Sequence, residues 1–99
     1  MRRVLGIHFV CRGDANVVDY GDGTFDSGIW VVGRAHHRTV EYIALHERKA
    51  ERSYRHGRVL KCRAVVHGGR ERVIFTVRQE GPTMDWVGDG AGERGYRWS

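Results

Sequence analysis

Proline, cysteine and lysine are scarce in this sequence, and it has no long apolar run. One proline, 40% apolar residues and no low-complexity segment exclude a disordered tail and indicate a folded domain. No stretch approaches the roughly 20 consecutive apolar residues of a membrane-spanning helix. Cys11 and Cys62 form no C-x-x-C pair, and residues 4–11 are typical of a first strand rather than of an export signal. We therefore expect a cytoplasmic protein with reduced thiols and no contact with a membrane.

Positive charge is concentrated in the middle of the chain. The sequence has 17 basic and 12 acidic residues, a net charge of +5. Residues 34–63 hold nine of the basic residues but only three acidic ones, which is typical of a surface that binds a polyanion. A GC-rich genome also favours arginine over lysine, but it does not explain the clustering. We predict contacts to nucleic acid, with DNA and RNA both open, from Arg34, Arg38, Arg48, Lys49, Arg52, Arg55, Arg58, Lys61 and Arg63.

Apolar and polar residues alternate along most of the chain, which predicts strands. Residues 4–11 and 42–46 show this pattern, and residues 34–40 are expected to form two helical turns. We predict a mainly β protein with one or two short helices, folded as a small, curved β-barrel. An open sheet with one helix across it is the alternative. Residues 1–99 form a single domain, and its segment from about residue 81 is rich in glycine and irregular.

The clearest predicted element is a β-hairpin around Gly68 and Gly69. Gly-Gly is a favoured two-residue hairpin loop because both residues can adopt positive φ. A one-residue slip would mispair both faces, so the pattern predicts the register as well as the hairpin. The apolar face pairs Leu60 with Val77, Cys62 with Phe75 and Ala64 with Val73. The opposite face contains Val59 and four positive charges, on Lys61, Arg63, Arg72 and Arg78.

Three segments of the chain resemble a known group of domains. Residues 27–38, with Gly28-Ile29-Trp30 before a short basic stretch, are similar to the strand, tryptophan and helix segment of YTH and EVE domains. Residues 42–46 resemble the EVE strand that ends in histidine, and residues 56–61 resemble the Gly-initiated strand that follows it. Both domains belong to the PUA-like superfamily of β-barrels. The resemblance covers residues 27–66 and implies a PUA-like fold that binds nucleic acid.

The resemblance also implies an aromatic pocket for a modified or flipped base. Trp30 corresponds to the YTH tryptophan that packs on the modified base, and His46 to the EVE histidine beside the pocket. Tyr54 lies in the basic loop 47–57 and is expected to close over the base. A base reader needs such a flat wall, a polar edge and cations at the rim. A core tryptophan and a histidine satisfied within the fold are the alternatives, and both stay open.

Two other functional classes remain beside the nucleic-acid-binding module. A small basic nuclease or nucleobase-modifying enzyme would use His46 with Glu47 or Tyr54 as an acid–base pair. A protein-interaction adaptor or inhibitor would only present the basic surface. We assign no catalytic residue and no cofactor, and we leave the oligomeric state open. We also expect no metal site, because the adjacent His36 and His37 do not share a helix face.

Overall fold

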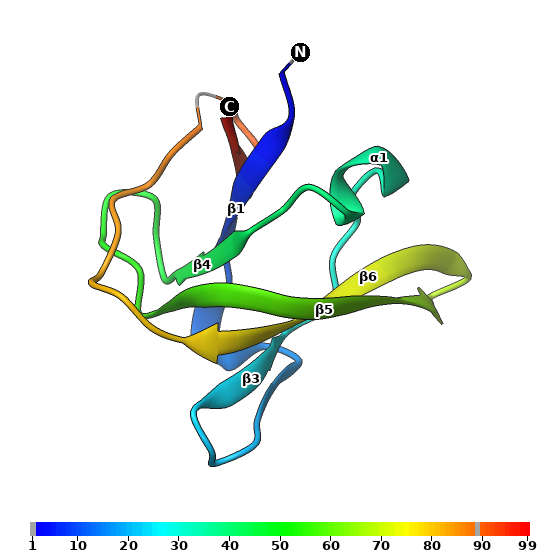
Figure 1. Cartoon of the computed structure of the whole chain (residues 1–99), viewed down its shortest axis with the longest axis horizontal. Coiled ribbons are helices and arrows are strands. Elements are labelled where there is room, and N and C mark those ends of the chain that lie inside the picture. The colour runs from blue at the N-terminus through cyan, green and yellow to red at the C-terminus, as the bar shows by residue number, and fades with distance from the viewer. Residues whose placement is uncertain (1, 89) are drawn as a thin grey trace.

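Strands dominate the computed structural model of the chain, which describes residues 2–88 and 90–99 (Figure 1). Within these ranges helix is confined to a 3-10 turn, Arg12–Asp14, and to the four residues of α1, Arg34–His37. The strands are β1 (Val4–Val10), β2 (Val17–Asp19), β3 (Thr24–Ser27), β4 (Tyr42–His46), β5 (Arg55–His67), β6 (Arg70–Gln79) and β7 (Arg94–Trp98). The prediction of a mainly β fold is confirmed.

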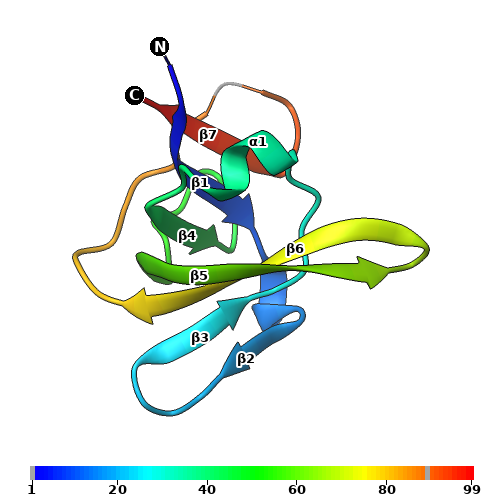
Figure 2. The same ribbon diagram turned by 45° about the vertical axis from the view of Figure 1, so that its right-hand side comes forward.

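All of these strands join one mixed sheet in the order β2-β3-β6-β5-β4-β1-β7 (Figure 2). β1 and β4 run parallel, and the other neighbouring pairs are antiparallel. In the described residues β2 and β7 do not pair with each other, so the sheet stays open and the predicted closed barrel is wrong. Alternating apolar residues indicate strands but not which edges meet, so the pattern did not determine closure.

One face of the sheet, which we call the inner face, holds the hydrophobic core. The first strand and the residue after it contribute Val4, Ile7, Phe9 and Cys11. Val4 and Ile7 are three positions apart but both are core residues, because the pairing of β1 with β7 shifts between Val4 and Gly6. The other buried core residues are Phe25, Val32, Val40, Ile43, Leu45, Val73, Phe75 and Val77. We call the opposite side of the sheet the outer face.

The β5–β6 hairpin has the predicted register along most of its length. Pairing follows the prediction from the loop back to Lys61 and Thr76. Beyond that pair the register shifts by one residue, and Leu60 is the extra residue of a β-bulge. Leu60 is therefore 46% exposed, and its predicted pairing with Val77 is wrong.

This bulge decides which face the preceding residues occupy. In a regular strand Arg58 and Lys61 would point to opposite faces, because they are three positions apart. The bulge puts both on the outer face, where Arg58 is paired with Arg78. Val59, which was predicted to point outward, packs against the core instead. Two adjacent apolar residues fit the inner face equally well, so the sequence did not reveal which one pairs.

Two further segments differ from their predictions. The expected two-turn helix over residues 34–40 is helical only in the four residues of α1. The glycine-rich segment from residue 81 has no strand or helix among its described residues until β7, which pairs with β1. This last strand and the contacts of Trp86 with His8 and His46 make the segment part of the fold. The described helices are too short to cross a bilayer.

Candidate nucleic-acid interface

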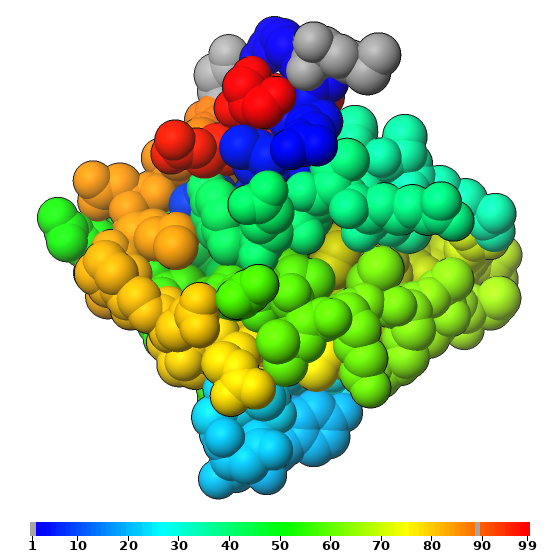
Figure 3. All heavy atoms as spheres, viewed as in Figure 1, coloured from blue at the N-terminus to red at the C-terminus, as the bar shows by residue number. Residues whose placement is uncertain are grey.

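Behind the turn at residues 67–70, five basic side chains occupy outward positions on two neighbouring strands. Outward residues alternate with core residues along β6 and, beyond the bulge, along β5. Figure 3 shows residues of these strands, in green to yellow, running across the molecule between the α1 segment and the β2–β3 segment. Four of the five residues are exposed and Arg72 is half-buried. We call this set the basic sheet face, and it consists of Arg58, Lys61, Arg63, Arg72 and Arg78.

A single acidic residue, Asp26, lies among the outward positions of β3, β5 and β6 in the described chain. It is 2% exposed and accepts hydrogen bonds from Tyr20 Oη at 2.6 Å, Thr76 Oγ1 at 2.8 Å and an Arg63 amino group at 3.0 Å. Burial alone would raise the pKa of Asp26, but these donors hold it below its usual value. Among the described residues, the other four cations of the basic sheet face have no carboxylate within ion-pair distance.

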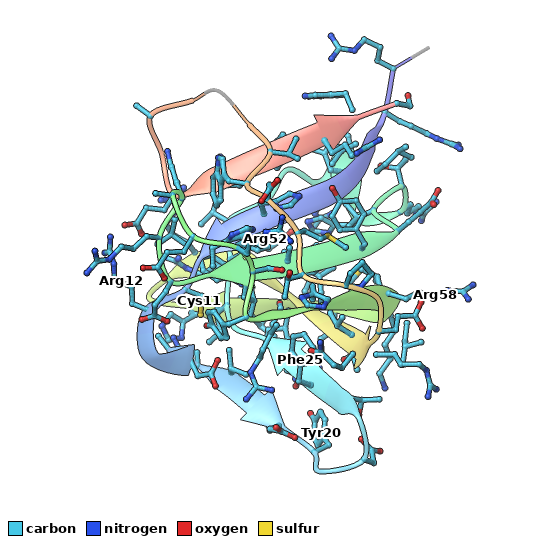
Figure 4. All side chains as sticks on the ribbon, turned by 90° about the vertical axis from the view of Figure 1, so that its left-hand side faces the viewer. Cys11, Arg12, Tyr20, Phe25, Arg52 and Arg58 are labelled. Carbon is cyan, nitrogen blue, oxygen red and sulfur yellow. The ribbon has the colours of Figure 1, made fainter. Side chains whose placement is uncertain are left out.

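The strand register continues this face toward β7. Arg78 is paired with Arg58, and Arg58 with Tyr42 of β4. Tyr42 is paired in turn with Gly6, and Gly6 with Arg97 of β7. Cross-strand partners share a face of the sheet. Tyr42 therefore lies in a line with arginines on both sides, and Arg58 extends away from the ribbon in Figure 4.

A chain of buried hydrogen bonds leads inward from Tyr42. Its Oη lies 2.9 Å from His8 Nε2, and His8 Nδ1 lies 2.9 Å from His46 Nε2. His46 Nδ1 is 2.9 Å from the backbone oxygen of Glu51, which can only accept a hydrogen bond. Because the Glu51 oxygen can only accept, it fixes the direction of all three hydrogen bonds. His46 donates to Glu51, His8 donates to His46, and Tyr42 donates to His8. We call Tyr42, His8 and His46 the histidine chain.

The two histidines of this chain are fully buried, which favours their uncharged forms. Burial lowers the pKa of His8 from 6.5 to about 4, and the nearby His46 and Arg97 add to the effect. The pKa of His46 is also lowered, mainly by burial. Trp86 covers both rings in edge-to-face contacts, with centroids 6.0 Å from His8 and 5.2 Å from His46. Because it covers both rings, Trp86 helps to exclude water from the histidine chain.

A second hydrogen-bonded group anchors the segment that covers the histidine chain. The Oγ of Ser53 lies 2.8 Å from His56 Nδ1 and accepts a 2.9 Å hydrogen bond from the backbone N–H of Met84. His56 Nε2 lies 2.9 Å from the backbone oxygen of Gly81, so this nitrogen carries the proton. Residues 81–86 are thereby fastened over one part of the outer face, and the basic sheet face lies beside them.

Charges of the predicted basic loop are largely engaged within the fold. Arg55 is held by Asp14 at 2.8 Å and by Asp19 at 3.1 Å, and Lys49 lies over the Trp86 ring at 5.3 Å. Of the nine predicted contact residues, the basic sheet face contains only Arg58, Lys61 and Arg63. Arg38 is exposed just after α1. Exposed carboxylates lie beside Arg34 (Glu71), Arg48 (Glu51) and Arg52 (Asp85).

The predicted base pocket is not assembled. Trp30 is half-buried on the inner face, where it stacks on Phe9 with ring centroids 4.0 Å apart and planes 14° apart. His46 is fully buried on the outer face, where it is bonded to His8. Phe9 and His8 are neighbours on β1 and point to opposite faces, so Trp30 and His46 are separated by the sheet. The Tyr54 hydroxyl contacts neither ring, because it donates to the backbone oxygen of Cys11.

The acid–base group of the alternative enzyme is not assembled either. Tyr54 donates its phenol proton to the backbone oxygen of Cys11, and Glu47 accepts the backbone N–H of Gly13 at 3.2 Å. Burial raises the pKa of Tyr54, and His46 is committed at both nitrogens. The described residues contain no cluster of three potential metal ligands.

A groove runs beside Tyr42 on this face. It has a volume of about 580 Å³ and is bounded by Tyr42, Arg58, Glu80 and Met84, among other residues. The walls combine an aromatic ring, apolar surface, the Arg58 cation and the carboxylates of Glu41 and Glu80. The aromatic and apolar part of this lining suits a flat ligand such as a base.

Comparisons with known proteins add no family to this picture. No protein-family model matches the sequence, and no curated protein or solved structure matches it. Function is therefore inferred from the geometry of the chain itself.

Several residues of this interface were not predicted as site residues. Arg72 and Arg78 were placed on the outward face of the hairpin but left out of the contact set, because that set followed charge density along the sequence. Tyr42 was assigned to a strand with no role of its own. Arg97 lies in a short segment of alternating residues, Arg94–Trp98, and this alternation was the available sign of a strand.

Proposed function

We propose that the protein is a nucleic-acid-binding module whose contact surface is the basic sheet face. The observation that carries the proposal is the gathering of five cations on one side of β5 and β6, where the buried Asp26 is the single acidic residue among the described outward positions of β3, β5 and β6. A phosphate backbone supplies the complementary charge, and the planar guanidinium fork of arginine suits phosphate oxygens. Four of these five cations are arginines.

The surface is also preorganised. Its residues project from paired strands, so their backbone positions are fixed before a ligand arrives. The hydrogen bond from Arg63 to Asp26 further restrains one of the guanidinium groups. In the loop at residues 47–54, by contrast, the cations either pair with exposed carboxylates or cover Trp86. The strand residues are therefore the better candidates for phosphate contacts.

The resemblance of residues 27–66 to EVE and YTH domains supports the same functional class. A PUA-like fold type stays a prediction, and so does the reading of a modified base. The proposal does not depend on either of them, because it uses no contact from Trp30 or His46.

Two double variants with the same change in charge test the proposal. We expect Arg58→Ala with Arg78→Ala to weaken binding of a fluorescently labelled oligonucleotide in an anisotropy titration. The slope of log K against log salt should fall by about 0.7 per lost contact for single strands, or about 0.9 for duplex DNA. Arg48→Ala with Arg52→Ala is the matched control and should change the slope less. Equal slopes for the two variants, or no binding by the unmodified protein, would contradict the proposal.

An acidic protein is the competing partner for this face, and the same titration separates the two. Nucleic acid is expected to bind with a steep dependence on salt, because the bound cations release counterions from the phosphates. Failure of every oligonucleotide to bind, in single-stranded and duplex form, would leave the basic sheet face to a protein partner and overturn the proposal.

A further inference from the structure

Tyr42 lies over the backbone of β1 because its partner there has no side chain. A Cβ atom added to Gly6 would stand 2.0, 2.1 and 2.7 Å from three atoms of the Tyr42 ring. Contacts this short do not occur, so any side chain at position 6 would displace the ring. One face of the tyrosine ring therefore covers Gly6, and its Oη reaches His8 beyond it.

The ring is held at both ends. The β4 backbone fixes one end, and the hydrogen bond to His8 fixes the other. His8 is itself locked, because its second nitrogen donates to His46. Tyr42 nevertheless stays half-buried rather than sealed, and it borders the groove on the outer face. The ring is thus a rigid aromatic surface that a ligand can reach.

Cations stand on both sides of this ring. Arg58 is on the strand next to Tyr42, and Arg97 is two strands away on the other side. Neighbouring strands are about 4.8 Å apart, so the two backbone positions lie at roughly 5 and 10 Å from that of Tyr42. Burial raises the pKa of the Tyr42 phenol, and the positive charge of Arg97 opposes this rise.

We propose that Tyr42 is a stacking platform for one unpaired base of a single-stranded nucleic acid, whose flanking phosphates contact Arg58 and Arg97. This inference rests on the proposed function and narrows it to single strands. Binding of single strands combines a cationic path for the backbone with aromatic rings on which bases stack. In a duplex the faces of each base are already covered by its neighbours, so Tyr42 would gain no partner there. The strand would run across the β-strands, along the line from Arg97 to Arg78.

The test compares two variants that share one defect and differ in the ring. Tyr42→Phe and Tyr42→Leu both remove the hydrogen bond to His8, but only Tyr42→Phe keeps an aromatic surface over Gly6. We expect Tyr42→Phe to bind a labelled single strand about as well as the unmodified protein. Tyr42→Leu should bind it roughly 5- to 150-fold more weakly, the range produced by losing one base–aromatic stack. The affinity for a matched duplex should be nearly the same in both variants.

A second measurement keeps the inference testable if Tyr42→Leu fails to fold. A single strand containing 5-iodouracil is irradiated with the unmodified protein, and the adduct is located by mass spectrometry. An adduct on Tyr42 supports the inference, and an adduct confined to other residues overturns it. Equal binding of single strands by both variants, or equal affinity of the unmodified protein for single strand and duplex, would also overturn it. In those cases the proposed function still stands if the double variant Arg58→Ala with Arg78→Ala binds the oligonucleotide more weakly than the unmodified protein. If the unmodified protein binds no oligonucleotide, both the proposed function and this inference are rejected.

Discussion

The outer face of the sheet has two parts, and polar side chains are buried in one and mostly exposed in the other. Under residues 81–86, His8 and His46 are buried, have pKa values below the usual value, and are hydrogen-bonded at both ring nitrogens. A strand or two away, the basic sheet face is charged and mostly exposed, and only Arg63 has a carboxylate partner among the described residues. The histidines of the first part find all their hydrogen-bond partners within the fold, whereas four of the five cations of the basic sheet face have no carboxylate partner among the described residues.

The covering segment accounts for this difference. Where it excludes water, a charge would be expensive, so the histidines are accommodated as neutral donors and acceptors. Where water reaches the sheet, like charges are solvated and screened and can stay close together. We therefore expect the histidine chain to determine stability and the basic sheet face to determine binding.

The largest effect is expected from breaking the histidine chain. His8→Ala leaves a cavity and removes the partners of Tyr42 and His46, so it should lower the free energy of unfolding by about 3–5 kcal/mol. Urea denaturation followed by circular dichroism measures this change. Lys61→Ala on the basic sheet face is the control and should stay within about 0.5 kcal/mol of the unmodified protein. An equal loss of unfolding free energy in His8→Ala and Lys61→Ala would contradict the expectation that stability depends on the histidine chain and not on the basic sheet face.

Acid should act on the same chain. The folded-state pKa of His8 is about 4 and its unfolded value is 6.5, so below pH 6.5 the unfolded chain takes up a proton that the folded chain refuses. His8 therefore stabilises the fold fully above pH 6.5, and this contribution of about 3 kcal/mol is lost as the pH falls to 4.

Other groups also titrate in this range, so the variant His8→Gln isolates the contribution of His8. The difference in unfolding free energy between this variant and the unmodified protein should shrink as the pH falls from 6.5 to 4. A difference that stays constant across that range would show that His8 titrates normally in the folded state.

Asp26 is a buried charge within the otherwise mostly exposed basic sheet face. Asp26→Asn should lower stability by about 1.5–3 kcal/mol, since hydrogen bonds to a charged group contribute about that much. Binding of an oligonucleotide at low salt should be as tight as before or tighter, because one negative charge is gone from the face. The two effects are read from a urea titration and an anisotropy titration. Weaker binding in a variant shown to be folded would mean that Asp26 itself takes part in recognition.

The smallest effect tests the bulge that brings Arg58 to the outer face. Val59 packs against the core and Leu60 is exposed, although the sequence pattern treats them alike. Val59→Ser should lower the unfolding free energy by about 1–2 kcal/mol through loss of apolar burial, and Leu60→Ser by less than about 0.5 kcal/mol. Thermal melts of the two variants measure the difference. A larger loss of stability in Leu60→Ser than in Val59→Ser would indicate a regular register without the bulge, in which Arg58 lies on the inner face.

Local patterns predicted the strands well. Gly68-Gly69 and the alternation around it determined the hairpin register as far as Lys61, and Tyr42–His46 is a strand with the predicted bounds. These features depend on short-range alternation and turn chemistry, which a sequence displays directly. The bulge at Leu60 and the last strand depend on contacts between distant segments, so they were not visible.

The candidate site was predicted only in part, for a related reason. Charge density along the chain selected residues 34–63, but Arg55 turned out to pair with Asp14 and Asp19 from a distant segment. The outward face of the hairpin, with Arg72 and Arg78, was the better guide because strand alternation determines it. The pairing of Tyr42 with Gly6 joins β1 to β4 in parallel, and no local pattern reports such a contact.

A nuclear magnetic resonance titration shows directly whether nucleic acid binds the basic sheet face. A ¹⁵N-labelled sample of the unmodified protein is titrated with a short single-stranded oligonucleotide, and the backbone amide shifts are mapped onto the sheet. We expect the largest changes on the outward residues of β5 and β6 and around Tyr42 and Arg97. Residues 48–52 and the surroundings of Trp30 should change little. Shifts concentrated in the loop or around Trp30, with β5 and β6 unchanged, would contradict the assignment of the basic sheet face.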